Sequence, residues 1–386
     1  MSHRSAQGSR PARPTHRRSS VRHLGLAVLA GLVALAGSAG CAAPASYQVT
    51  TMASGLNRPW DGAFTPDGSF LYTERVGRIG VVRGGSKRTL ATPSDVVAQG
   101  EGGMLGLDVD PNFATNRRIY TCFVSSKGGL GARVVRWNVS ADWRSLTGRT
   151  DLLSGIEVHA SGRHSGCRVK VGPDGALWVT TGDAAKGTNP QDRNSLAGKV
   201  LRMTTNGDAA AGNAGGPWRN EVYAAGFRNP QGLAFRPGDN QAFLVEHGPE
   251  CDDEITPLRR GGNGGWNPVG GTYNEGVPMT DTRIANAMAP SWKSGCPTIA
   301  PSGAAFTNGG AWGLFNNRLA VAVLKGQHLR LHSFDPNNGN RSDAGTVILS
   351  NQGRLRTAVS APDGSLWVLQ DSSNGKIFKV RPVPGG

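Results

Sequence analysis

The side chains best suited to chemistry in this chain gather in the segment 221–266, among Gly and Pro residues. Arg228 and Asn229 precede a Pro, Gly248 and Pro249 follow, and an acidic triplet occupies 252–254. A guanidinium can stabilise negative charge, an amide can bond polar edges, and carbonyl or carboxylate oxygens can hold a hard cation. Loops of this kind on a rigid scaffold usually form a site, so we expect a binding or catalytic site here.

The elements that would position these loops follow from a repeated turn. Pro-Asp-Gly precedes a short strand pattern at Pro66, Pro173 and Pro362, and variants of it contain Pro111 and Pro237. The copies lie about 45 to 64 residues apart, except for a double-length last interval that contains a degenerate copy at 312–323. Six units of this size predict an all-β fold, a six-bladed β-propeller with four-stranded antiparallel blades. A β-sandwich or two unrelated β domains is the alternative.

The composition agrees with this fold and indicates an exported protein. The 56 Gly and 23 Pro residues favour many turns, and residues 45–384 show no linker, which predicts one domain. Residues 1–41 carry six Arg, an apolar run at 24–36 and then Cys41, which is typical of an export signal. That run is shorter than the roughly 20 residues of a membrane span. Ala39-Gly40-Cys41 resembles a bacterial lipobox, so a lipid anchor at Cys41 is one hypothesis, with a periplasmic or cell-surface location.

The net charge of +15 bears on which kinds of molecule the protein could bind. Six of these charges precede residue 41, and the remaining excess should attract anions. The basic residues of the mature chain are interspersed with acidic ones, and no nucleic-acid-binding motif is present, so nucleic acid is not an expected partner.

The four cysteines after Cys41 predict two disulfides in an exported protein. Four cysteines allow three connectivities, and the sequence alone does not choose among them. Our hypothesis joins Cys122 to Cys167 and Cys251 to Cys296, because the members of each pair lie close in the chain. Buried free thiols are the alternative, and the missing CxxC spacing argues against zinc.

Ten short segments of the mature chain together resemble a known family. They are Gly-Leu-Asn-Arg-Pro-Trp at 55–60, Glu-Gly-Gly-Met-Leu-Gly at 101–106, His-Ser-Gly-Cys-Arg at 164–168, Thr-Gly-Asp at 181–183, Leu-Ala-Gly-Lys-Val-Leu-Arg at 196–202, Gly-Phe-Arg-Asn-Pro-Gln-Gly at 226–232, Glu-His-Gly-Pro at 246–249, Pro-Ser-Gly at 301–303, Leu-Lys-Gly at 324–326 and Gly-Arg-Leu-Arg at 353–356. In this order and spacing they resemble the soluble aldose sugar dehydrogenases that depend on pyrroloquinoline quinone (PQQ), of the glucose/sorbosone dehydrogenase family. The likeness covers nearly the whole mature chain.

The resemblance implies a six-bladed propeller, in agreement with the repeat count. It also implies oxidation of the anomeric hydroxyl of an aldose to a lactone, with PQQ as hydride acceptor, Ca2+ holding the quinone, and an external electron acceptor. In such enzymes the cofactor carries the hard chemistry, and the protein supplies position and charge.

For catalysis, the resemblance assigns roles to three side chains. His164 matches the base, a role that suits a side chain titrating near neutral pH. Asp183 matches the acid that supports the base, since a carboxylate favours the imidazolium that develops. Arg228 matches the cation that stabilises negative charge on the reduced cofactor.

Further residues match binding positions of the family. Arg228 and Asn229 match contacts to the quinone edge, and PQQ carries three carboxylates, for which planar guanidiniums are well suited. The matched carboxylate binders are Lys325, Arg354 and Arg356, and the last two should share one face of a strand. Glu101 stands where some members have a substrate-binding Gln, which predicts a different sugar preference.

The resemblance implies two calcium sites. Gly248 and Pro249 match positions whose backbone carbonyls bind the calcium that contacts the cofactor. Glu254 matches a ligand of a second, structural calcium, although Gly264 stands where a relative has Tyr. Trp266 or Trp292 could form an apolar wall for a sugar ring.

Two other functions are alternatives to a sugar dehydrogenase. The first is a non-catalytic extracellular propeller that serves as a binding module of the same family. Such proteins lose the base or the cationic residues, whereas this chain keeps His164, Arg228 and Lys325. The second is a metal-dependent lactonase or esterase on a propeller, which would need converging acidic and amide ligands from several blades.

Overall fold

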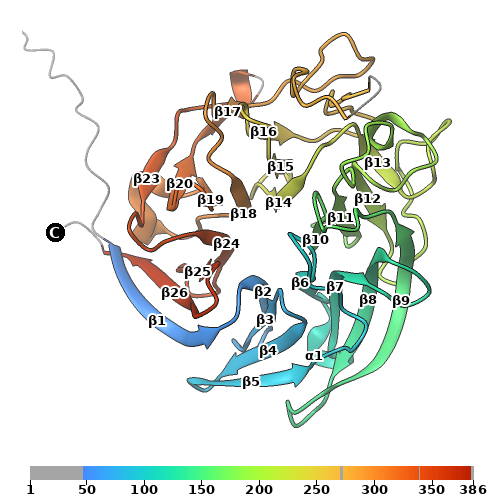
Figure 1. Cartoon of the computed structure of the whole chain (residues 1–386). Helices are drawn as coiled ribbons and strands as arrows, with labels where there is room; N and C mark the ends of the chain where they lie inside the picture. Colours follow the sequence, from blue (N-terminus) through green and yellow to red (C-terminus); the bar gives the residue numbers. More distant parts are fainter. Residues whose placement is uncertain (1–46, 270–272, 339, 384–386) are drawn as a thin grey trace, which may run out of the picture. The chain divides into compact units, whose positions relative to one another are not determined.

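The computed structural model describes residues 47–269, 273–338 and 340–383, which form six four-stranded antiparallel sheets around one axis (Figure 1). The predicted six-bladed β-propeller is therefore confirmed. The expected export signal, residues 1–41 with Cys41, lies outside the described residues. None of the helices that the structure describes is long and apolar enough to cross a membrane.

Five blades are built from strands that follow one another in the sequence, named here from the inner strand outward. They are β2 (Pro59–Phe64), β3 (Phe70–Glu74), β4 (Arg78–Arg83) and β5 (Ser86–Ala91); β6 (Met104–Val109), β7 (Arg118–Ser125), β8 (Gly131–Val139) and β9 (Leu146–Ile156); β10 (Gly166–Val171), β11 (Leu177–Thr181), β12 (Lys199–Met203) and β13 (Val222–Ala225); β14 (Pro230–Phe235), β15 (Ala242–Glu246), β16 (Glu254–Pro257) and β17 (Trp292–Lys293); and β18 (Pro301–Phe306), β19 (Leu319–Val323), β20 (His328–His332) and β23 (Thr346–Ile348).

The sixth blade joins the two ends of the described chain. Its strands are β24 (Leu355–Ser360), β25 (Leu366–Gln370), β26 (Gly375–Pro382) and, outermost, β1 (Tyr47–Leu56). β1 pairs antiparallel with β26 from Tyr47 opposite Pro382 to Leu56 opposite Gly375. This pairing closes the ring between the first and the last strands of the described chain.

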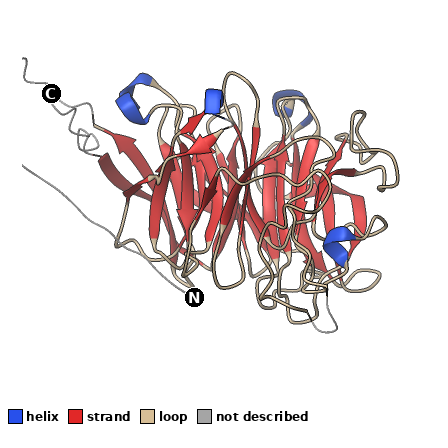
Figure 2. Ribbon diagram, turned by 90° about the horizontal axis from the view of Figure 1, so that it is seen from above, coloured by secondary structure: helices blue, strands red, loops and turns tan. Residues whose placement is uncertain are grey.

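Helices are few and short in the described part of the chain. They are α1 (Phe113–Asn116), η1 (Asn189–Gln191), η2 (Gly310–Phe315) and η3 (Pro336–Asn338), and a two-stranded hairpin is formed by β21 (Phe334–Asp335) and β22 (Arg341–Ser342). In the side view, the strands run between two ends that are covered by loops (Figure 2).

The Pro-Asp-Gly repeats are the turns that join each inner strand to the second strand of its blade. In the first copy, the Asp67 carboxylate accepts hydrogen bonds from the Thr65 hydroxyl and the Ser69 backbone N–H, and Gly68 takes a positive φ of 80°. Such a φ favours glycine, which explains the third residue of the repeat. The degenerate copy at 312–323 corresponds to η2 and β19, which belong to the fifth blade as predicted.

Apolar side chains fill the spaces between blades. The inner strands β2, β6, β10, β14, β18 and β24 pack side by side in this ring order. Leu105, Val169, Val179 and Leu201, for example, lie fully buried in one cluster that joins the second and third blades. Burial at about 25 cal/mol per Å² of apolar surface makes these clusters the main source of stability.

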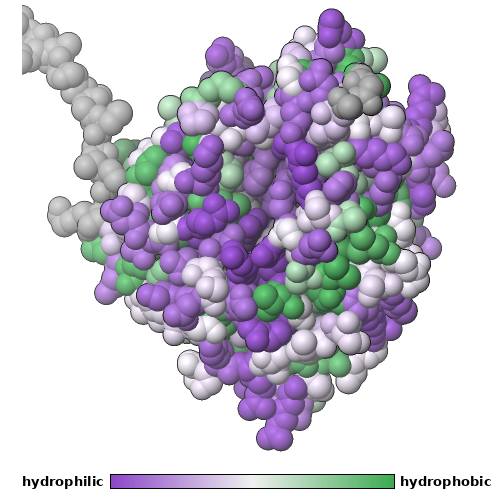
Figure 3. Space-filling model, in the orientation of Figure 1, coloured by the Kyte–Doolittle hydropathy of each residue, from purple (hydrophilic) through white to green (hydrophobic). Residues whose placement is uncertain are grey.

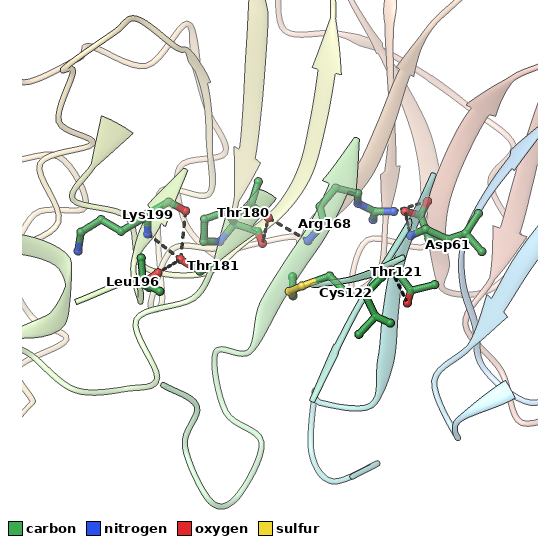
Figure 4. The surroundings of a disulfide bond; sticks show 12 residues. Asp61, Thr121, Cys122, Arg168, Thr180, Thr181, Leu196 and Lys199 are labelled. Carbon is green, nitrogen blue, oxygen red and sulfur yellow. Dashed lines mark hydrogen bonds and ion pairs between the residues drawn. A yellow bond between two sulfur atoms is a disulfide. The ribbon is translucent and has the colours of Figure 1, made fainter. Parts of the chain in front are cut away.

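Both predicted disulfides are present. Cys122 of β7 is bonded to Cys167 of β10 and links neighbouring blades, and both cysteines are fully buried (Figure 4). Cys251 is bonded to Cys296, and it links the loop after β15 to the loop before β18. Cys296 lies at the exposed surface.

We expect the two disulfides to differ in access to reductant. Dithiothreitol without denaturant should release the two thiols of Cys251 and Cys296, whereas the Cys122 to Cys167 bond should resist until the protein unfolds. Alkylation followed by mass spectrometry measures this. The double variant C251S/C296S should lower the free energy of unfolding by about 2 to 4 kcal/mol, since each bond closes a loop of 45 residues. Release of all four thiols from folded protein would contradict the first expectation.

Candidate active site

The residues assigned roles in the sequence lie at one end of the propeller. His164 and Arg228 directly precede β10 and β14, whereas Asp183 follows β11. Neighbouring strands of a blade are antiparallel, so each second strand ends where the inner strand begins. Contacts between blades join these ends, including hydrogen bonds from the Asp183 N–H to the Arg228 carbonyl and from the Glu101 N–H to the Gly162 carbonyl. In the view down the axis, hydrophilic side chains gather around a central hollow (Figure 3).

His164 and Asp183 form a buried pair. The Nδ1 atom of His164 lies 2.8 Å from Oδ1 of Asp183, and both side chains are almost completely buried. An ionised carboxylate only accepts hydrogen bonds, so Nδ1 carries the proton and Nε2 is left unprotonated in the neutral ring. His164 adopts a positive φ of 53°, and the Ala185 backbone N–H fixes the same Asp183 oxygen at 2.8 Å. The imidazole is thereby oriented with its basic nitrogen away from the carboxylate.

The other oxygen of Asp183 accepts hydrogen bonds from two side chains that were not predicted from the sequence to be donors. Trp266 donates its indole N–H to Oδ2 at 2.9 Å, and the Tyr273 hydroxyl donates to the same oxygen. Trp266, expected as an apolar wall, is fully buried and acts here as a hydrogen-bond donor. Trp292 belongs to β17 at the outer edge of its blade, where it packs on His332.

Arg228 occupies a buried position beside this pair. Its Nη1 donates to the His247 carbonyl at 3.1 Å, and its guanidinium lies 5.6 Å from the centre of the Trp266 ring. Its Nη2 forms an ion pair with Glu275, and Glu275 also binds Arg163. Burial would raise the pKa of Glu275, but the bonds to Arg228 and Arg163 outweigh burial and lower it, so this carboxylate stays ionised.

Asn229 and Glu101 contact each other across the blades. The Asn229 side-chain amide donates to the Glu101 carboxylate at 2.8 Å, and it accepts from the Gln231 amide at 2.9 Å. Asn229 is buried, whereas Glu101 is exposed at the mouth. The Glu101 carboxylate, which can only accept hydrogen bonds, therefore lies at the surface where a polar ligand would enter.

Arg354 and Arg356 belong to a larger cluster of cations. Both contact Oδ2 of Asp371, at 3.8 and 2.8 Å, so their side chains point the same way as expected, although only Arg356 belongs to β24 and Arg354 directly precedes it. Arg58 lies 3.3 Å from Oδ1 of the same carboxylate. Burial would raise the pKa of Asp371, but Arg356, Arg354 and Arg58 lower it, so Asp371 is ionised. Arg58 and Asp371 were not assigned from the sequence.

Arg75 adds a fourth guanidinium to this cluster of positive charges. The pKa of Arg75 is lowered first by burial and then by the charge of Arg58, with Arg356 also contributing. Four cations around Asp371 leave a surplus that only an anion can neutralise. Lys325 follows β19 at the same end; its side chain is exposed, and its ammonium has no hydrogen bond or ion pair within the described residues.

Three buried nitrogens near the centre have no hydrogen-bond partner in the described part of the chain. They are Nε2 of His247 and the Nε atoms of Arg228 and Arg356. Burial, followed by the charges of Arg356 and Arg228, lowers the pKa of His247 to about 3, so its ring is neutral. Unpaired buried polar atoms are costly, and a polar ligand would satisfy them. Together with the surplus of guanidiniums, they suit a ligand with several carboxylates.

The residues expected to bind calcium lie in two separate places. The Gly248 and Pro249 carbonyls accept no hydrogen bond from the described residues, and Asp253 fixes their loop by accepting from the backbone N–H groups of Gly248, Ile299 and Ala300. Two free carbonyls are suitable donors for a hard cation. Within the described residues, however, no group of three or more His, Cys, Asp or Glu is arranged to hold a metal ion.

Glu254 already pairs with a protein cation, which it shares with Asp252. The Lys293 ammonium lies 3.2 Å from its carboxylate, and the Thr280 hydroxyl lies within 2.9 Å of both carboxylate oxygens. Lys293 thus supplies positive charge at the position for which a second calcium was expected.

We predict that the arginine cluster binds a multivalent carboxylate. Citrate should raise the thermal midpoint of the protein more than NaCl at equal ionic strength, because a ligand at 100 times its Kd stabilises by about 2.7 kcal/mol. The variant R354A/R356A should lose this difference. R83A/R144A, which removes two exposed arginines of the same charge, is the matched control and should keep it. Equal responses of the two variants would show that the effect is unspecific.

Comparison with known proteins identifies relatives along nearly the whole chain. The sequence model of the Glucose / Sorbosone dehydrogenase family matches residues 56–379. Aldose sugar dehydrogenase YliI of Escherichia coli is 32% identical, covering 88% of this chain and 94% of that protein. Quinoprotein glucose dehydrogenase B of Acinetobacter calcoaceticus is 26% identical, covering 88% and 90%. The PQQ-bound structure of an aldose sugar dehydrogenase from Streptomyces coelicolor aligns with a TM-score of 0.73, at 29% identity, over 88% and 99% of the two chains.

Proposed function

Because the chain belongs to the glucose/sorbosone dehydrogenase family, whose members include sugar dehydrogenases, we propose that it is a PQQ-dependent aldose sugar dehydrogenase. It would oxidise the anomeric hydroxyl of an aldose to a lactone, with calcium as the clamp of the cofactor. The observation that carries this proposal is the joint presence of a buried His164 to Asp183 pair and a surplus of guanidiniums at one mouth.

His164 is the proposed base. Its Nε2 takes the proton of the anomeric hydroxyl, while Asp183 stabilises the imidazolium that forms. When bound, PQQ would supply a two-electron acceptor for the hydride. Arg228 lies beside the pair and stabilises negative charge that develops during the reaction, because a preorganised buried cation costs little reorganisation.

The remaining site residues bind and orient. Arg354 and Arg356 would hold the carboxylates of the cofactor, with Lys325 reaching in from the surface, and Asn229 would bond its polar edge. Calcium would bind the Gly248 and Pro249 carbonyls. Glu101 is exposed beside Asn229, and its carboxylate would accept hydrogen bonds from sugar hydroxyls.

We further propose that the protein is exported and works in the periplasm or at the cell surface, with an external electron acceptor. The two disulfides are consistent with an oxidising compartment. We also propose a lipid anchor at Cys41, because Ala39-Gly40-Cys41 resembles a bacterial lipobox.

We expect purified protein to bind PQQ in the presence of calcium and to reduce an artificial electron acceptor when aldoses are added. Bleaching of the bound cofactor on addition of sugar, followed by absorbance, measures binding and reaction together. Binding of PQQ with no turnover on a broad aldose panel would instead favour the non-catalytic binding module. Absence of both binding and turnover would overturn the proposal.

The variant H164Q should lower kcat by about 10² to 10⁴, because it removes the base while keeping the polarity of the side chain. Its affinity for PQQ should change little, as the arginine cluster is untouched. The control H159Q alters an exposed histidine outside the described pair and should leave kcat unchanged. A kcat for H164Q near that of the control would remove His164 from catalysis.

Calcium removal should abolish turnover reversibly. Dialysis against a chelator, followed by titration with Ca2+, measures the metal affinity. The variant D253N should weaken that affinity by about 10-fold to 100-fold, because Asp253 orients the loop of both carbonyls. P249A keeps its carbonyl and should keep the wild-type affinity. Full activity after exhaustive chelation would contradict the role of calcium.

A further inference from the structure

The Tyr273 hydroxyl contacts both members of the buried pair. It donates to Oδ2 of Asp183, and its oxygen lies 3.2 Å from Nδ1 of His164. Tyr273 comes from the long loop between β16 and β17, and it lies 90 residues from Asp183 in the chain. Tyr273 takes no direct part in the proposed reaction.

Asp183 accepts four hydrogen bonds, and Tyr273 supplies the one that can be removed most cleanly. The other donors are the His164 ring, the Ala185 backbone N–H and the Trp266 indole N–H. The Trp266 ring is fully buried, so replacing it would also create a cavity. Replacing Tyr273 by Phe removes only one oxygen atom.

The Tyr273 hydroxyl remains a donor over the working pH range. Burial, followed by the charge of Asp183, raises the pKa of this hydroxyl well above its usual value. A hydrogen bond donated to a carboxylate withdraws part of its charge and lowers its basicity. Asp183 in turn stabilises the imidazolium of His164, so less charge on Asp183 means a less basic His164.

We propose that Tyr273 is a positioning residue that sets the basicity of His164 through Asp183. The inference rests on the proposed role of His164 as base. Loss of the hydroxyl leaves Asp183 more strongly charged, which favours the imidazolium and raises the pKa of His164. The loss of the weaker contact to Nδ1 acts in the opposite direction, but hydrogen bonds to a charged group are roughly twice as strong as neutral ones.

Other charged groups around the pair bear on the same equilibrium. Arg163 lies 5.5 Å from the centre of the Tyr273 ring, and Arg228 and His247 lie close to the pair. Lys199, buried behind Asp183, has a pKa lowered to about 7 by burial, and the Glu275 carboxylate pairs with both Arg163 and Arg228. These groups are unchanged in a Tyr273 variant, so the comparison isolates the hydroxyl.

The test measures the titration of His164 by NMR in protein without cofactor. The His164 signal is assigned by its absence from H164Q. In Y273F, we expect the pKa of His164 to rise by about 0.5 to 1 unit relative to wild type. Y273L should give a similar rise, since both variants lack the hydroxyl. Y223F, which removes a tyrosine hydroxyl from β13 beside Trp178, is the matched control and should give none.

Activity gives a second readout. The acidic limb of the kcat/KM profile should move to higher pH by the same amount in Y273F, while activity well above the pKa should stay close to wild type. An unshifted His164 titration in both Y273F and Y273L, with wild-type thermal unfolding, would overturn the inference. If wild-type protein shows no turnover but its His164 titration shifts as described, the proposed function fails and the hydroxyl's effect on His164 stands.

Discussion

Six inner strands pack around one axis, and the loops before them meet at the same mouth. Since the second strand of each blade is antiparallel to the first, its last residue reaches that mouth too. Arg58, His164, Arg228 and Arg356 all stand at or just before the start of an inner strand, whereas Asp371 follows a second strand. Strand direction alone therefore brings together residues that are hundreds of positions apart. The Pro-Asp-Gly turns, by the same rule, occupy the other end.

A buried ion pair, Arg168 with Asp61, connects the inner strands of different blades. The Arg168 guanidinium contacts the Asp61 carboxylate at 2.5 Å (Figure 4). It also donates to the Gln231 carbonyl and lies 4.2 Å from the centre of the Trp60 ring. These contacts join β2, β10 and β14 across the centre. Burial lowers the pKa of Arg168, and Asp61 opposes that effect. Removing either partner would leave a buried charge, at a cost of about 3 to 5 kcal/mol, so the pair also keeps the inner strands in one arrangement.

The fold was predictable because its signal is local and repeated. Each Pro-Asp-Gly turn is specified by three adjacent residues, as Asp67 and Gly68 illustrate, and the repeat count then gives the number of blades. The cofactor and base assignments depended on the family resemblance, which carries information about segments in order. Tyr273 and Asp371 lie outside those segments, and their partners are 90 and 15 residues away, so no local pattern indicates them.

The acidic triplet that marked the segment 221–266 shows why composition alone misleads. Asp253 caps backbone N–H groups in its loop, whereas Glu254 begins β16 and pairs with Lys293 of β17. Successive residues at the start of a strand point to opposite faces, so Asp253 and Glu254 diverge. Asp252 and Glu254 do converge, but on a protein cation, since both contact the Lys293 ammonium, at 3.3 and 3.2 Å.

The charges of the site are distributed unevenly, and this restricts how a ligand can bind. Near His164, the two guanidiniums of Arg228 and Arg163 lie beside two carboxylates, Glu275 and Asp183, so the formal charges there cancel. Arg58, Arg75, Arg354 and Arg356 share mainly Asp371, so this part of the mouth keeps a surplus of positive charge. Under the proposed function, an anion with several carboxylates would be drawn to that surplus, and the part of the mouth near His164 would be left for an uncharged sugar.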